Sequence, residues 1–167
     1  WSEPMEVEKA ALALDAALPR GIRVLAADAV DTHHAALMSQ AAGASYRVTL
    51  PYSKDVSAAV AEFNAASELM FKKAAPKTKA KFKEIDVKFY IQQLTAEHTE
   101  KETIFSFDCK ITPTGSMKAV DLLNALNEQY GLALPVEMAD IERLRLYRNN
   151  KNGKPIPMLN SDAVTLG

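Results

Sequence analysis

Strict alternation of apolar and polar residues predicts three half-buried strands. In the clearest case, Tyr46, Val48 and Leu50 share one face of a strand. The same period of two places Phe107 and Cys109 on the apolar face of a later strand. Such patterns favour a sheet with one buried face. The segments are "SYRVTLPY" (45–52), "TIFSFDCKI" (103–111) and "DIERLRLYR" (140–148).

Apolar residues that recur at helical spacing predict three longer helices. The first precedes "PRG" at 19–21, and the second has Ser53 or Asp55 as its cap. The third begins at Ser116 as N-cap and closes at Gly131. Asp86 is predicted to cap a short fourth helix. The predicted helix faces contain Val7, Ala10, Ala11, Leu14 and Leu18; Val56, Ala59, Val60 and Phe63; and Val120, Leu123, Leu126 and Tyr130.

Two stretches around a lysine-rich centre predict a β-hairpin. Its strands are "LMFKKA" (69–74) and "KFKEIDV" (81–87), with Lys81 and Lys83 on one face and Phe82 on the other. "IRVLAADAV" (22–30) is rich in apolar and β-branched residues and predicts a further strand.

The order of these elements predicts an α+β fold: a mostly antiparallel sheet with about three helices packed on one side. We expect a single domain over residues 1–150 and a loosely ordered C-terminal tail over 151–167. The chain of 167 residues is long enough to bury a core without disulfides or metals.

Composition and hydropathy indicate the cellular compartment and whether a membrane is a partner. The single Cys109 excludes an intrachain disulfide and fits a reducing compartment, so we expect a cytoplasmic protein. No apolar run approaches the roughly 18 residues of a membrane span, so we expect no membrane partner.

The sequence holds no motif for catalysis or cofactor binding, so we expect no catalytic activity of its own and no cofactor. "TPTGSMK" resembles the end of a phosphate loop but lacks the upstream glycine, and Gly115, Ser116 and Lys118 fit a turn followed by a helix cap. His33 and His34 are adjacent and point apart, so we expect no metal site.

The most distinctive feature is a basic stretch at residues 71–88. It holds seven lysines against one glutamate and one aspartate, a net charge of +5 in a chain of net charge −1. Lysines contact phosphates, and nearby aromatic rings can stack on bases, which favours RNA. Lysines on a hairpin also simply keep it solvated. The candidates are Lys72, Lys73, Lys77, Lys79, Lys81, Lys83 and Lys88.

A second basic group lies in the strand at 140–148. Alternation places Arg143 and Arg145 on one face, opposite Leu144 and Leu146. Arginine suits bidentate contact with phosphate, and Arg148 follows closely. These arginines would extend the basic surface if their strand adjoined the hairpin.

Five blocks in this order carry a family resemblance: "LDAALPRGIRVLAADAV", "ASYRVTLP", "KFKEIDVKFYIQQL", "TGSMKAVDLLNAL" and "IERLRLYR". Together they resemble the uncharacterised prokaryotic radical SAM-linked proteins, which are encoded beside, or fused to, a radical S-adenosylmethionine protein. The resemblance spans about Leu14 to Tyr147 and implies a radical SAM protein as partner. It also implies a further N-terminal β-α-β portion that precedes Trp1.

Two functions remain open at this point. The chain is either an accessory module that binds RNA and presents it to a radical SAM enzyme, or a non-enzymatic domain that docks on that enzyme without nucleic acid.

Overall fold

The computed structural model describes residues 5–31, 33, 35–52, 54–75, 81–160 and 163–166. The helices are α1 (Val7–Ala17), α2 (Leu37–Gln40), α3 (Ser57–Ala65), α4 (Val87–Tyr90), α5 (Ala119–Tyr130) and the 3₁₀ helix η1 (Val136–Met138). The strands are β1 (Ala26–Ala27), β2 (Ala41–Leu50), β3 (Met70–Ala74), β4 (Phe82–Asp86), β5 (Leu94–His98), β6 (Thr103–Thr112), β7 (Gly115–Ser116), β8 (Asp140–Asn149), β9 (Pro155–Pro157) and β10 (Val164–Thr165).

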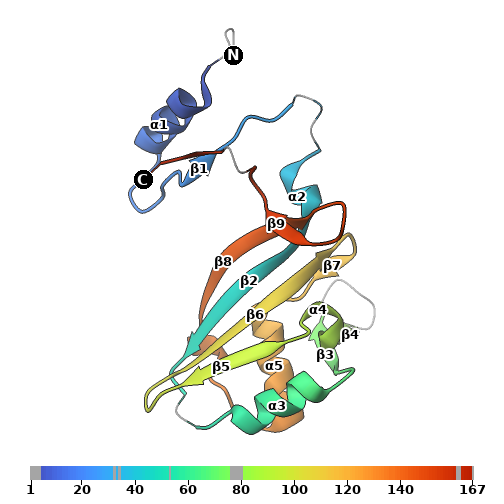
Figure 1. Ribbon diagram of the computed structural model, residues 1–167. Helices are drawn as coiled ribbons and strands as arrows, with labels where there is room; N and C mark the ends of the chain where they lie inside the picture. Colours follow the sequence, from blue (N-terminus) through green and yellow to red (C-terminus); the bar gives the residue numbers. More distant parts are fainter. Residues whose placement is uncertain are drawn as a thin grey trace.

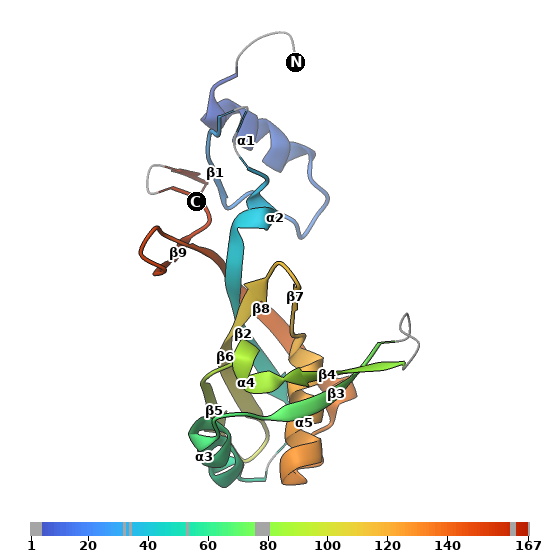
Figure 2. The same cartoon turned by 90° about the vertical axis from the view of Figure 1, so that its right-hand side faces the viewer.

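The main sheet of the described chain is antiparallel, with strand order β5-β6-β2-β8-β9 and β7 paired to β6. Helix α5 and the β3–β4 hairpin lie on one side of this sheet, as Figure 2 shows edge-on, while α3 runs beside β5. Figure 1 looks onto the opposite face, which α5 does not cover and α4 borders at one edge. The predicted α+β class and antiparallel sheet are confirmed.

The core lies between the inner face of the sheet and α5. Phe105, Phe107 and Cys109 alternate inward from β6, as the sequence predicts, and their exposed fractions are 0%, 6% and 1%. From α5, Leu122 and Leu126 meet this face. Burial of each such side chain stabilises the folded state by about 1.5–3 kcal/mol relative to exposure to water. The alternation of apolar residues therefore decides which face of the sheet is buried.

One carboxylate joins the hairpin to the short helix after it. Oδ1 of Asp86 accepts hydrogen bonds from the backbone N–H of Lys88 and of Leu69, each at 3.0 Å. The first bond caps α4, as predicted, and the second holds the start of β3. The predicted hairpin is confirmed, with Phe71 paired to Ile85.

The N-terminal part departs from the sequence prediction. Helix α1 forms, yet Ala11 is its buried residue and Leu14 stays 56% exposed, because no described element packs against that side. The predicted strand at 22–30 shortens to Ala26–Ala27, paired with β10. Residues 151–167, predicted to be loose, include β9 and β10 in their described part, since β8 and β1 offer free edges.

The start of α5 also differs from the prediction. Ser116 belongs to β7 and pairs with Ile111, so it is not the helix cap. Lys118 takes the N-cap position, and its backbone N–H donates to the Asp121 carboxylate at 3.3 Å. Gly131 ends the helix in the left-handed conformation (φ 62°), as predicted.

Asn127 stabilises the loop after α5 by pairing with the backbone of Leu134. Its Nδ2 donates to the Leu134 carbonyl at 3.0 Å, and its Oδ1 accepts from the Leu134 N–H at 2.7 Å. Leu134 is 4% exposed, so neither backbone group has easy access to water.

We expect Asn127→Asp to lower the free energy of unfolding by about 1–3 kcal/mol, because the carboxylate loses the donor to a part-buried carbonyl. Urea denaturation followed by circular dichroism measures this. Asn124→Asp, an exposed change on the same helix, is the matched control and should shift stability by less than about 0.5 kcal/mol. Equal losses in the two variants would contradict the role given to Asn127.

Candidate functional site

The β3–β4 hairpin projects from the side of the sheet that carries α5 (Figure 2). Phe71 and Ile85 are buried on one face of it, beside the cross-strand pair Lys73 and Lys83. Phe82 is 55% exposed on the other face. The hairpin is therefore anchored at its base by two apolar residues, and its basic residues lie towards the tip.

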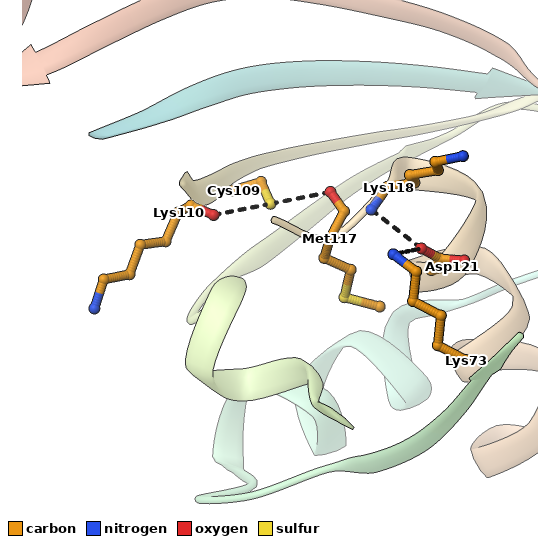
Figure 3. A network of polar contacts seen from close by, with 6 residues as sticks. All are labelled: Lys73, Cys109, Lys110, Met117, Lys118 and Asp121. Carbon is orange, nitrogen blue, oxygen red and sulfur yellow. Dashed lines mark hydrogen bonds and ion pairs between the residues drawn. The ribbon is translucent and has the colours of Figure 1, made fainter. Parts of the chain in front are cut away.

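Two of the predicted lysines are engaged with carboxylates. Nζ of Lys73 lies 2.7 Å from the Asp121 carboxylate at the start of α5, and both side chains are largely buried (Figure 3). This ion pair fastens the hairpin to the helix. Lys72 faces Glu84 at 4.0 Å, an exposed pair of little energetic weight.

Lys88 is not a surface residue, which corrects its place among the RNA candidates. Its side chain is 8% exposed. Nζ donates to the carbonyls of Phe63, at 2.9 Å, and Gln92, at 2.5 Å, and lies 4.4 Å from the Phe63 ring centre. Burial lowers the pKa of Lys88, while nearby Asp86 opposes this. Lys88 therefore ties α3 to the turn after α4.

The remaining lysines of the stretch are Lys77, Lys79, Lys81 and Lys83. The first two lie outside the described residues. Lys81 and Lys83 are exposed, and no carboxylate of the described chain forms an ion pair with either.

The arginines do not extend this surface. β8 lies in the main sheet, whereas the hairpin stands off its helix-covered side, and Figure 1 shows the two elements apart. A register shift at Ser45 and Tyr46 pairs Arg143 with Tyr46 and Arg145 with Ser45, which interrupts the predicted alternation. Arg148 donates to the Pro157 carbonyl at 3.2 Å and to Asn160 at 2.9 Å, and so holds the C-terminal segment.

Gly115, Ser116 and Lys118 form the link between β6 and α5. Gly115 has φ 133°, and its carbonyl accepts from the Thr112 hydroxyl at 2.8 Å. Cys109 is buried below this link with its thiol directed at the Met117 carbonyl, 3.4 Å away (Figure 3), and burial raises its pKa. These groups fit the structural role of a turn and a cap.

Two negative findings concern the described residues alone. Their His, Cys, Asp and Glu side chains form no group of three or more that could hold a metal. None of their helices has the length and apolar character needed to cross a membrane.

Sequence reasoning missed a hollow on the open face of the sheet. This sheet-face groove, of about 730 Å³, has a floor from β2 and β6, one wall at α4 and another at β8 and the β8–β9 turn. Its lining includes Ser45, Phe89, Asp108, Lys110 and Tyr147. The polar positions of the alternating strands were the available signal, because they define the face that the core does not use.

A family model described as "uncharacterized protein conserved in bacteria (DUF2344)" matches residues 1–123. The chain belongs to this family. A search of curated proteins and a search of solved structures found no match. The DUF2344 match covers the basic hairpin and the start of α5, whereas the arginines of β8 lie beyond it.

We expect Lys88→Met to lower the free energy of unfolding of this DUF2344 domain by about 1–3 kcal/mol. Methionine keeps the apolar stem but leaves the carbonyls of Phe63 and Gln92 without their donor. Chemical denaturation is the measurement. Lys83→Met, on the exposed hairpin, should change stability by less than about 0.5 kcal/mol, and a neutral Lys88→Met would contradict the anchoring role.

Proposed function

We propose that this chain is a non-enzymatic accessory domain that docks on a partner protein through its N-terminal segment, residues 5–38. The observation that carries the proposal is a concentration of exposed apolar side chains. Of the fifteen large apolar residues that are exposed in the described chain, eight lie in this segment. They are Met5, Leu12, Leu14, Ile22, Leu25, Val30, Leu37 and Met38.

This segment has internal structure despite its exposure. The Asp15 carboxylate accepts from the backbone N–H of Val24 at 2.7 Å and faces Arg23 at 3.4 Å, which holds the end of α1 against the approach to β1. The amide of Asn160 donates to Asp28 at 2.8 Å and links the segment to the C-terminal part. An exposed surface rich in apolar side chains is typical of a protein–protein interface.

The resemblance to the radical SAM-linked proteins supports a radical SAM protein as the partner. An accessory domain needs no catalytic residues of its own, and an apolar, ordered surface is what such docking requires. In this proposal the domain contributes a surface, and the chemistry belongs to the partner.

Replacing exposed apolar residues of the segment tests docking. We expect Leu14→Glu combined with Met38→Glu to weaken binding to the purified radical SAM protein of the same source at least tenfold, because two charges would be placed against an apolar interface. Biolayer interferometry measures the Kd. The matched control is Met70→Glu with Met138→Glu, which changes two exposed methionines elsewhere.

Three results would count against docking through this segment. These are the absence of any complex at micromolar concentration, equal weakening by the control pair, and self-association of the wild-type chain that the Leu14 and Met38 changes abolish. The last result would assign the segment to a second copy of this chain.

A second candidate function, RNA binding, is favoured by one observation on the hairpin. Lys81, Phe82 and Lys83 are consecutive exposed residues on an arm that projects from the body of the protein, with Lys83 on the other face of the strand from Phe82. Exposed cations and an exposed aromatic ring on one arm suit the phosphates and a base of a single strand.

We expect Lys81→Glu with Lys83→Glu to weaken binding of a fluorescein-labelled single-stranded RNA and to lower the slope of log K against log salt by about two. Fluorescence anisotropy at several salt concentrations measures both effects. Lys54→Glu with Lys101→Glu makes the same change of net charge on exposed residues elsewhere. If both pairs weaken binding equally, the hairpin is not the contact.

A further inference from the structure

The sheet-face groove is built around a tyrosine that lies across the neighbouring strand. Tyr147 of β8 is the register partner of Gly43 in β2, and a Cβ at Gly43 would overlap the tyrosine ring and hydroxyl. Only glycine leaves room for the ring there. Gly43 also pairs with Lys110 of β6, so the ring extends from β8 towards β6. One aromatic ring therefore covers part of the floor.

The opposite wall supplies a second ring with a cation beside it. Phe89 on α4 is 49% exposed and packs edge-on against Tyr90, with 5.0 Å between ring centres. Nζ of Lys110, on β6, lies 4.5 Å from the Phe89 ring centre. This contact holds an exposed positive charge at the rim of the groove.

A carboxylate also lines the groove. Asp108 and Lys110 are two residues apart and share one face of β6, roughly 7 Å apart along the strand. The Ser45 hydroxyl donates to Oδ1 of Asp108 at 2.5 Å, which leaves acceptor capacity on the carboxylate. Burial, and then the charge of Asp108, raise the pKa of Tyr147.

Further polar and basic groups surround the groove. Asn149, Gln92 and Gln93 line it with amide groups that can both donate and accept. Gly153, at the β8–β9 turn, also lines it, and the exposed Lys151 and Lys154 flank that glycine.

We propose that the sheet-face groove binds a nucleotide unit, with the base against the rings of Phe89 and Tyr147 and the phosphate near Lys110. Aromatic rings on the open face of a sheet stack on bases of either type, and a carboxylate beside them accepts from an exocyclic amino group. The unit is either part of a single-stranded nucleic acid or a free mononucleotide. This site is separate from the docking segment and from the basic hairpin.

The same groups disfavour other occupants. A purely apolar ligand would remove Asp108 and Lys110 from water without giving either a partner. A cationic ligand would be repelled by the ammonium of Lys110, which lies 4.5 Å from the Phe89 ring centre. A nucleotide offers a base to the aromatic rings, a hydrogen-bond donor to the carboxylate of Asp108 and a phosphate to the ammonium of Lys110.

The test uses the whole chain with AMP, with UMP and with fluorescein-labelled six-nucleotide RNA. In NMR spectra of the chain, we expect binding to shift the backbone amide signal of Gly153, which lies at the groove. The amide signal of Gly21, in the N-terminal segment, should stay unchanged. We expect Phe89→Ala to weaken the affinity at least about fivefold, by loss of stacking. Lys110→Gln should lower the salt slope for the RNA by about one.

Met138→Ala and Lys101→Gln are the matched controls, because they change an exposed apolar side chain and an exposed lysine outside both the groove and the hairpin. They should leave the affinity for AMP unchanged. Circular dichroism shows whether Phe89→Ala folds, and Lys110→Gln, at an exposed position, provides the second measurement if it does not.

The outcomes distinguish a free mononucleotide from a nucleic-acid strand, and nucleotide binding from docking of a protein. Binding of AMP or UMP that depends on Phe89 assigns the groove to a single nucleotide. Binding of the RNA alone, with the same dependence, assigns it to a strand. No binding of any probe at millimolar concentration overturns the inference. Equal losses from Phe89→Ala and Met138→Ala overturn it as well. Weaker docking of the radical SAM protein by Phe89→Ala, without nucleotide binding, would give the groove to a protein partner instead.

Discussion

One-sided burial of an antiparallel sheet governs the architecture of this domain. Phe105 and Val48 lie on the inner face and are fully buried against α5 and its neighbours. Because side chains of a strand alternate, the residues between them must lie on the outer face, where serine, threonine and charged residues meet water. The open face and its groove therefore follow from the way the core is built.

Internal contacts also explain why the basic residues do not form one surface. Lys73 and Lys88 come from the most basic part of the sequence, yet one is paired with Asp121 and the other donates to backbone carbonyls. Arg148 is likewise used to hold the C-terminal segment. A positive charge is stabilised beside a carboxylate or beside the carbonyl groups at the C-terminus of a helix, so part of the positive charge of this stretch serves the fold.

The N-terminal segment presents the opposite situation, apolar residues that the fold does not use. Helix α1 has the periodicity of a packed helix and buries Ala11, but in the described chain Leu12 and Leu14 stay more than half exposed. The hydrophobic effect makes such a surface costly in water and favourable at an interface, which is why this segment carries the docking proposal.

The sequence by itself determined the elements whose patterns are local. Alternation identified β2 and β6 and their buried faces, Asp86 marked the cap of α4, and Gly131 marked the end of α5. Only the tertiary structure decided the features that depend on pairing between strands far apart in the sequence. The register shift at Ser45 and Tyr46 separates the arginines of β8, and the approach of Tyr147 to Gly43 shapes the groove. These features depend on which strands become neighbours, and no local period encodes that choice.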